Sequence, residues 1–312
     1  MFSRLSRRDL LHTAAAASVG LAAATSSSAE PSKDPFRYCL NTSTISGQQL
    51  DIIQVVEIAA KAGYDGLEPW IRELDQFVKG GGNVKDLGKR IQDRGLKVAS
   101  AIGFSEWIVD DPEKRKKGLE DARRSMDIVQ QIGGTRIAAP PAGATKQENM
   151  NPVIIAERYR ALLEVGDKIG VVPMAEMWGH SKPLNRLGDV AFIALECGHP
   201  KACVLADVFH LYKSGSDFKG IHLLSADALP HIHLNDYPAQ PPRAEITDAA
   251  RVYAGDGVAP LKDILRDLRN LGFHGMLSLE LFNRDYWKQD ALQVAKVGLE
   301  KMKSVVKASL ES

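Results

Sequence analysis

Residues 204–236 read VLADVFHLYKSGSDFKGIHLLSADALPHIHLND. This stretch contains two short apolar runs, and each run ends in residues that commonly bind metals. Residues 204–206 lead into Asp207, and residues 229–232 lead into His233. An ionisable side chain at the end of a buried strand costs free energy unless it has a partner, so two in succession suggest a shared ligand. We interpret that ligand as a divalent metal ion.

The same arrangement occurs in two further apolar runs. Residues 171–175 precede Glu176, and residues 276–279 precede Glu280. Four predicted strands therefore end, in chain order, in Glu, Asp, His and Glu. These four side chains are the candidate metal ligands.

One unit recurs around these runs, in which an amphipathic helix ends at a glycine and a short apolar strand follows. The glycines expected at helix C-termini are Gly63, Gly95, Gly133, Gly170, Gly198 and Gly272. The predicted strands are 37–41, 66–69, 97–103, 136–139, 171–176, 202–207, 231–235 and 276–281. The predicted helices include 84–94, 112–131, 152–169, 188–196, 260–271 and 291–310. Most strands are nearly continuous apolar runs, as in parallel strands buried on both faces. Eight of them separated by helices predict an α/β fold, a single-domain (β/α)8 TIM barrel.

Residues 1–29 have the layout of an export signal. Arg4, Arg7 and Arg8 form a basic start, an alanine-rich apolar run follows, and residues 27–29 (SSA) resemble a small-residue cleavage site. Residues 6–11 (SRRDLL) resemble the twin-arginine motif of proteins exported in the folded state.

The domain prediction follows from this layout. We expect a twin-arginine-type signal at 1–29, an N-terminal tail at 30–35, a barrel at 36–312, and a periplasmic or otherwise exported protein. The apolar run is shorter than the roughly 20 residues that span a bilayer, so we expect no stable membrane insertion after cleavage. A cytoplasmic N-terminal helix or an uncleaved anchor is the alternative.

The composition is that of an ordinary globular protein. The chain has 44% hydrophobic and 25% charged residues and a formal net charge of +1. It lacks the basic excess that binding to a phosphate backbone needs, so nucleic acid is not an expected partner. Its three cysteines form no Cys-x-x-Cys pair, and we assign them no function.

In a βα-barrel, residues at the C-terminal ends of the strands converge on one face. Glu176, Asp207, His233 and Glu280 would then surround one position. Three carboxylates and one imidazole suit Mn²⁺, Mg²⁺ or Co²⁺ in octahedral geometry, with Zn²⁺ less favoured. Two coordination sites would stay open for two oxygens of a hydroxy-ketone.

The sequence resembles the xylose isomerase-like superfamily of sugar isomerases and epimerases, which includes ketose 3-epimerase and inosose dehydratase-like members. The resemblance spans roughly residues 36–306. It rests on residues 63–68 (GYDGLE), Glu176, Asp207-x-x-His210, His233-x-x-Asp236, residues 254–257 (AGDG) and Glu280.

The resemblance implies a reaction on a ketose or related carbohydrate through an enediolate. Glu176 and Glu280 would be metal ligands and also the paired acid and base, facing each other across the substrate. Return of the proton to the opposite face gives epimerisation, and return to the neighbouring carbon gives aldose/ketose isomerisation. His210 would bind a substrate oxygen. Arg243 resembles the family arginine that follows the strand-seven histidine, although it lies further along, and Arg251 could fill that role instead.

Other residues are candidates for the substrate pocket. Glu68 follows the second strand as a substrate contact or as the partner of a barrel arginine. Trp70, Trp107 and Trp178 follow strands two, three and five, where they could form apolar walls against a sugar ring or could simply pack loops.

Two alternative functions stay open. A metal-dependent dehydratase of keto-sugars or inososes would share every ligand, but several dehydrating members of the family have lysine near the position of Asn235, and an amide cannot act as an acid. A non-catalytic exported carbohydrate-binding barrel would not require two carboxylates facing each other across a metal. The sequence leaves the sugar or polyol, the metal and the oligomeric state open, a homo-oligomer included.

Overall fold

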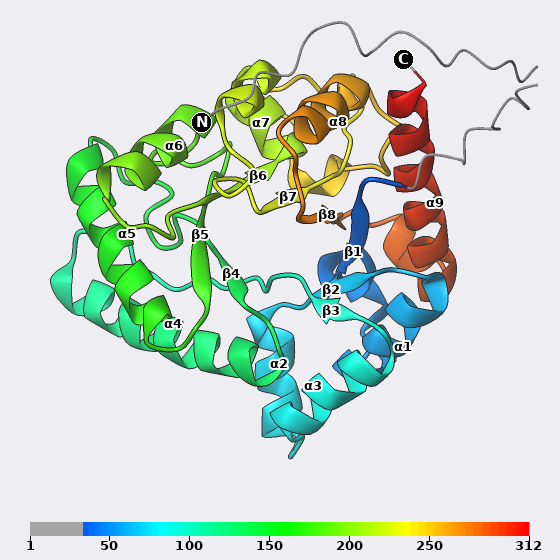
Figure 1. Cartoon of the computed structure of the whole chain (residues 1–312), viewed down its shortest axis with the longest axis horizontal. Coiled ribbons are helices and arrows are strands. Elements are labelled where there is room, and N and C mark those ends of the chain that lie inside the picture. The colour runs from blue at the N-terminus through cyan, green and yellow to red at the C-terminus, as the bar shows by residue number, and fades with distance from the viewer. Residues whose placement is uncertain (1–33, 312) are drawn as a thin grey trace, which may run out of the picture. The chain divides into compact units, whose positions relative to one another are not determined.

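Eight parallel strands form the sheet of the computed structural model, which describes residues 34–311 (Figure 1). The expected export signal at residues 1–29 lies outside the described residues. The strands are β1 (Arg37–Asn41), β2 (Gly66–Glu68), β3 (Lys97–Val98), β4 (Arg136–Ala139), β5 (Val172–Glu176), β6 (Val204–Asp207), β7 (His231–His233) and β8 (Met276–Leu279). Their order in the sheet is β3-β2-β1-β8-β7-β6-β5-β4.

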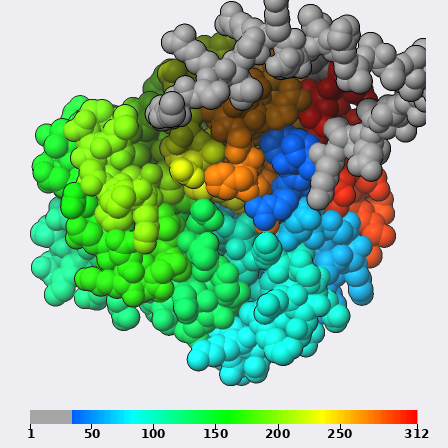
Figure 2. Space-filling view, in the orientation of Figure 1, coloured from blue at the N-terminus to red at the C-terminus, as the bar shows by residue number. Residues whose placement is uncertain are grey.

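The seam between β3 and β4, at the two ends of that order, is joined by the backbone. The N–H of Ala138 in β4 donates to the carbonyl of Ala101, just after β3, at 2.8 Å. The sheet therefore curls round on itself, and side chains fill the space that the ribbon encloses (Figure 2). The predicted TIM barrel, built as a single domain, is confirmed.

The third strand is much shorter than its apolar sequence predicts. Residues 97–103 were expected to be extended, but only Lys97–Val98 form regular ladder pairs. Ala99 N donates to Leu67 O, and Ile102 N donates to Pro69 O. Between these two hydrogen bonds the chain advances three residues on the β3 side, from 99 to 102, but two residues on the β2 side, from 67 to 69. This mismatch is the geometry of a β-bulge. The bulge ends the regular ladder without breaking the contact to β2.

The helices alternate with the strands along the chain and pack around the outside of the sheet (Figure 1). They are α1 (Ile52–Ala62), α2 (Ile71–Lys79), α3 (Val84–Asp93), α4 (Pro112–Gln131), α5 (Pro152–Asp167), α6 (Leu187–Glu196), α7 (Val208–Ser214), α8 (Leu261–Asn270) and α9 (Ala291–Leu310). Short 3-10 turns are η1 (Thr42–Gln48), η2 (Phe218–Leu223), η3 (Asp248–Ala250) and η4 (Tyr286–Lys288). Within residues 34–311, none of the helices combines the length and the apolar character that a bilayer span requires.

The predicted glycine stops are confirmed by the backbone. Gly63, Gly95, Gly133, Gly170, Gly198 and Gly272 all have positive φ, a conformation that favours glycine. The sequence pattern did not predict two of the helices, α2 and α7. α2 buries only Ile71 and Leu74, and α7 has seven residues, so neither carries a long apolar stripe.

The inside of the barrel is divided into an apolar half and a polar half. The apolar cluster comprises Trp70, Ile102, Ala138, Met174, Cys203 and Leu205, which lie in or close to β2 to β6. The buried polar side chains of β1, β2, β7 and β8 are Asn41, Glu68, His231, His233 and Ser278, and Glu176 and Asp207 join them at the ends of β5 and β6. This polar half supports the candidate site.

Asp236 fastens the long loop that follows β7. Its carboxylate accepts hydrogen bonds from the backbone N–H groups of Tyr237, Gly255, Gly257 and Ala259 at 2.8 to 3.1 Å. The His233-x-x-Asp236 motif and the glycine-acid-glycine turn therefore meet in space. Asp236 holds the loop over the barrel and makes no contact with the candidate ligands among the described residues.

Replacing Asp236 with asparagine is expected to lower the free energy of unfolding by about 2–3 kcal/mol, because an amide NH₂ would face backbone donors that now bond to a charged acceptor. Urea denaturation followed by circular dichroism measures this. Asp256→Asn, on the same turn, is the matched control, since Asp256 forms an ion pair with the surface residue Lys301. Equal free energies of unfolding for the two variants would show that Asp236 does not hold the loop after β7 in place.

Candidate functional site

The four predicted metal ligands come together at the C-terminal end of the barrel. Glu176, Asp207 and His233 are the last residues of β5, β6 and β7, and Glu280 directly follows β8. Nδ1 of His233 lies 3.1 Å from Glu280 Oε2, 3.2 Å from Asp207 Oδ2 and 3.9 Å from Glu176 Oε1. All four side chains are buried. Residues more than a hundred positions apart thus form one compact donor set.

The charges of this cluster fit a cation. Asp207 and Glu280 share the guanidinium of Arg251, but the carboxyl group of Glu176 makes no hydrogen bond within the described part of the chain. Burial raises the pKa of Glu176 well above its ordinary value, and the charges of Glu280 and Asp207 raise it further against the opposing effect of His233. One atom each from Asp207, His233 and Glu280 lies within 4.8 Å of the others. A divalent ion among these donors would relieve the repulsion that Glu176 experiences.

A second set of polar groups lies beneath His233 and orients its ring. Glu68 Oε2 lies 3.1 Å from His233 Nε2 and accepts hydrogen bonds from Asn41 and Ser278 at 2.9 and 2.6 Å. Glu68 Oε1 lies 3.1 Å from His231 Nε2, without hydrogen-bond alignment. A carboxylate on one ring nitrogen directs the other nitrogen toward a metal.

Glu68 corrects a sequence-based prediction. It was expected to contact substrate or to pair with an arginine, yet its side chain is fully buried below His233 and pairs with histidines. The reason is its register: Glu68 is paired with Asn41 on β1, and its side chain points into the polar half of the barrel.

Arg251, rather than Arg243, is the arginine of the cluster. Its Nη1 lies 2.6 Å from Asp207 and 3.0 Å from Glu280, and its Nη2 lies 2.6 Å from Asp248. Arg243 is exposed, and its backbone carbonyl accepts a hydrogen bond from Lys213. The loop fastened by Asp236 turns back at η3, which brings Arg251 inward and leaves Arg243 outside.

His210 lines the same site. Burial lowers the pKa of His210 to about 4, against the opposing charge of Asp207. Its Nε2 lies 3.3 Å from Arg251 Nη2, which can only donate, so we assign the ring hydrogen to Nδ1. That Nδ1 has no hydrogen-bond partner among the described residues.

A cavity of about 520 Å³ opens above the cluster. Of the four candidate ligands, only Glu176 and Glu280 line it, while Asp207 and His233 lie below. The polar side chains that accompany the two glutamates include His180, His210, Asp248 and Arg251, and the apolar ones are Trp70, Ile102, Phe104, Trp178, Phe282 and Trp287. A molecule in this cavity would meet the carboxylates of Glu176 from β5 and Glu280 from the end of β8, with Asp248 from the loop as a third.

The three predicted aromatic walls divide into two lining residues and one core residue. Trp70 and Trp178 line the cavity. Trp107 does not, because its side chain is fully buried, donates to Pro140 O and packs on Tyr159. Sequence reasoning missed Phe104 and Phe282, although each directly follows a predicted strand, the position that marked the other lining residues.

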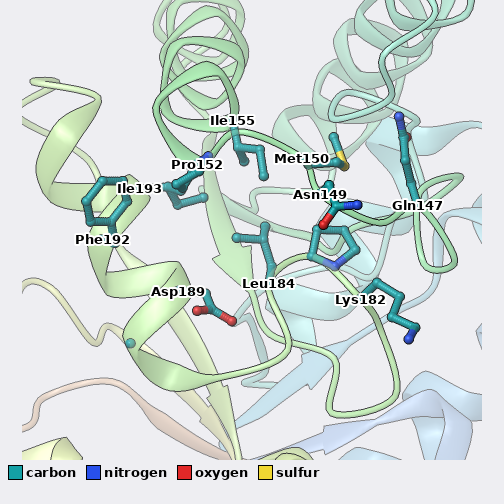
Figure 3. Close-up of a pocket in the computed structure, with 12 residues that line it drawn as sticks. Gln147, Asn149, Met150, Pro152, Ile155, Lys182, Leu184, Asp189, Phe192 and Ile193 are labelled. Atoms are coloured by element: carbon teal, nitrogen blue, oxygen red, sulfur yellow. The ribbon is translucent and has the colours of Figure 1, made fainter.

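Two other cavities lack this chemistry. The cavity in Figure 3, of about 460 Å³, lies near α5 and α6 and has Lys182 and Asp189 as its ionisable lining residues. Asp189 is engaged by the backbone N–H of Arg186. A larger cavity of about 850 Å³ lies at the N-terminal ends of the strands and has no carboxylate in its lining. The reactive groups of TIM barrels gather at the opposite, C-terminal end.

Metal loading is expected to release protons and to bind more tightly as pH rises. Burial opposes protonation of His233, but the charges of Glu280 and Glu68 raise the pKa of His233 well above its ordinary value. With the raised pKa of Glu176, both shifts favour the protonated forms in the metal-free protein, and a ligand must lose its proton to bind a metal.

Isothermal titration of the metal-free protein with Mn²⁺ in two buffers of different ionisation enthalpy measures this release, which should be on the order of one proton per ion. His222→Gln, an exposed histidine, should titrate like the parent, whereas Asp207→Asn should bind weakly. Binding of Mn²⁺ without proton release would contradict the assignment of Glu176 and His233 as ligands that lose a proton to the solvent.

Known proteins are similar to this chain over most of its length. A family model described as a xylose isomerase-like TIM barrel matches residues 56–305. An inosose isomerase of Bacillus velezensis is 24% identical over 277 residues, covering 86% of this chain and 97% of that protein. A 3-dehydroshikimate dehydratase of Pseudomonas putida is 23% identical over 248 residues, covering 79% of this chain but 38% of that longer protein.

A solved structure, the crystal structure of IOLI protein with a zinc atom bound, superposes with a TM-score of 0.80 at 20% identity. It covers 88% of this chain and 99% of that chain. At this identity the likeness shows the fold.

Proposed function

The chain belongs to the xylose isomerase-like TIM barrel family, and from this premise we propose that it is a divalent-metal-dependent isomerase or epimerase of a keto-sugar or related carbohydrate. One observation carries the proposal: the two buried glutamates, Glu176 and Glu280, line one cavity directly above a histidine and a further carboxylate. Relatives that are isomerases support an enzymatic role.

The donor set suits a metal that assists proton abstraction. Held by Glu176, Asp207, His233 and Glu280, a divalent ion would polarise the substrate carbonyl and acidify the neighbouring C–H. The zinc in the IOLI structure supports a divalent ion here, so Zn²⁺ joins Mn²⁺, Mg²⁺ and Co²⁺ as a candidate.

The side chains of this chain supply the proton transfers. Glu176 and Glu280 come from strands that are separated in the sheet by β6 and β7, so they approach the cavity from two sides. One glutamate removes the proton beside the carbonyl, and the other returns a proton to the opposite face, which inverts that carbon. Return to the adjacent carbon instead interconverts aldose and ketose.

Arg251 and His210 bind the oxygens of the substrate in this proposal. The free Nδ1–H of His210 donates to a hydroxyl, and the charge of Arg251 offsets the negative charge that develops on oxygen as the C–H proton leaves. The export signal expected at residues 1–29 would place this enzyme in the periplasm or outside the cell.

Asn235 argues against the dehydratase alternative, which the Pseudomonas relative would otherwise favour. Its amide lies 3.3 Å from both oxygens of Asp207 and 3.4 Å from Glu280 O, and its Oδ1 accepts from Phe209 N at 3.0 Å. Asn235 therefore braces the cluster and cannot supply the proton that expels water.

The test is solvent isotope exchange. Protein loaded in turn with Mn²⁺, Mg²⁺, Co²⁺ or Zn²⁺ is incubated in D₂O with ketoses, aldoses and inososes, and the products are read by NMR and mass spectrometry. We expect deuterium on a carbon beside the carbonyl and a new stereoisomer. A product lighter by one water would establish the dehydratase instead, and absence of exchange with every metal and sugar would reject the enzyme proposal.

A further inference from the structure

Four aromatic rings line the candidate active-site cavity in a continuous series, which we call the aromatic belt: Phe282, Trp70, Phe104 and Trp178. The ring centroids of Phe282 and Trp70 lie 5.8 Å apart, those of Trp70 and Phe104 5.1 Å, and those of Phe104 and Trp178 5.8 Å. The four residues follow β8, β2, β3 and β5, so the belt connects the ends of four strands.

The belt presents apolar surface to the cavity. Phe104 is 46% exposed although it contacts both tryptophans. The indole N–H of Trp70 is already used by Asn41 Oδ1 at 2.9 Å, so Trp70 offers its ring and no free donor. Ile102 extends this wall. A flat apolar group placed against these rings would leave water and gain ring contacts, which is favourable.

The same cavity also has polar groups in its lining, beside the two ends of the belt, where His180 stacks on Trp178 and Arg251 lies over Phe282. Glu176, Glu280, His210 and Arg251 offer the donors and acceptors that sugar hydroxyls need. The volume of about 520 Å³ lies in the range of cavities that hold drug-sized ligands, about 300–1,000 Å³. The cavity therefore combines polar groups that suit a carbohydrate with an aromatic wall that suits an apolar substituent.

We propose that the substrate is a keto-sugar carrying an aryl or comparable flat apolar substituent. The sugar contacts the two glutamates, and the substituent packs against Phe104 between Trp70 and Trp178. This inference rests on the proposed function for its chemistry. The reaction is unchanged: one glutamate takes a proton from carbon, the other returns one, and the substituent is not altered.

The test compares matched substrates that differ in the substituent alone. The 6-O-phenyl and 6-O-methyl ethers of the D-ketohexoses are given to the metal-loaded protein, and kcat and KM are measured by deuterium incorporation. We expect the phenyl ether to have a KM about tenfold lower at similar kcat, the size of one good aromatic contact. Equal KM values for the two ethers would overturn the inference.

Phe104→Ala separates recognition of the substituent from other roles of the belt. The variant should raise KM for the phenyl ether about tenfold more than it raises KM for the methyl ether. Phe192→Ala is the matched control, because Phe192 is 37% exposed in the separate cavity of Figure 3 and should affect neither ether. If Phe104→Ala impairs both ethers alike, Phe104 packs the loop or covers the sugar, and the inference fails.

Failure of the proposed function gives a different result. If neither ether exchanges deuterium, binding of both to the metal-loaded protein is measured by titration calorimetry. Preference for the phenyl ether that disappears in Phe104→Ala would uphold the belt as a recognition surface while rejecting the isomerase. No preference in binding would reject the inference as well.

Discussion

Glutamine in place of Glu280 is expected to lower kcat by about 10²–10⁴-fold, the contribution typical of a positioned acid or base. Glu280 lines the cavity and lies 3.1 Å from His233 Nδ1, so it touches both the metal donors and the space for substrate. An amide keeps an oxygen for the metal but cannot exchange a proton. Turnover should therefore fall much further than sugar affinity.

Three measurements on Glu280→Gln test this prediction: deuterium exchange measures turnover, elemental analysis measures metal content, and calorimetry measures sugar binding. Glu245→Gln is the control, since Glu245 is exposed on the loop that carries Arg251. Turnover of Glu280→Gln within about tenfold of the parent would exclude Glu280 as acid or base. A parent protein that binds sugar without turnover, and whose affinity the substitution leaves intact, would be a binding protein.

Arg251→Met is expected to lower the free energy of unfolding of the metal-free protein by about 3–5 kcal/mol, because it leaves buried carboxylates without their partner. Arg251 bridges Asp207 and Glu280, both buried, and also pairs with Asp248. Methionine keeps an unbranched apolar chain beside Phe209 and Phe282, over which the guanidinium now lies. The decrease in the free energy of unfolding therefore comes from the lost charge more than from lost packing.

A divalent ion should restore part of this stability, since it would supply the positive charge that the variant lacks. Urea denaturation with EDTA and with saturating Mn²⁺ measures both states of parent and variant. Arg243→Met, an exposed arginine on the same loop, should change stability by no more than about 0.5 kcal/mol. An equal loss with and without metal would show that the ion and Arg251 do not act on the same carboxylates.

The sequence alone determined the fold class and the order of the candidate ligands. Apolar runs that end in Glu176, Asp207, His233 and Glu280 are local features, and so are the glycines that stop the helices. Parallel strands of one barrel all point the same way, so whatever follows each strand meets at one end. Periodicity and chain order suffice for that inference.

Only the tertiary structure decided which neighbouring residues contact the cavity. Trp70 and Trp107 both follow predicted strands, yet one lines the cavity and the other is in the core. Arg251 reaches the cluster and Arg243 does not, because Asp236 fastens the loop at points up to 23 residues further along.

Glu68 shows most clearly why the sequence alone did not predict the contacts of the buried polar residues. Its partners His231 and Ser278 are more than 160 positions away in sequence, and they meet it through the register of β1, β2, β7 and β8. Patterns along a chain report which side chains must be buried. The identity of a buried charge's partner depends on strand register and loop path, which many distant contacts set together.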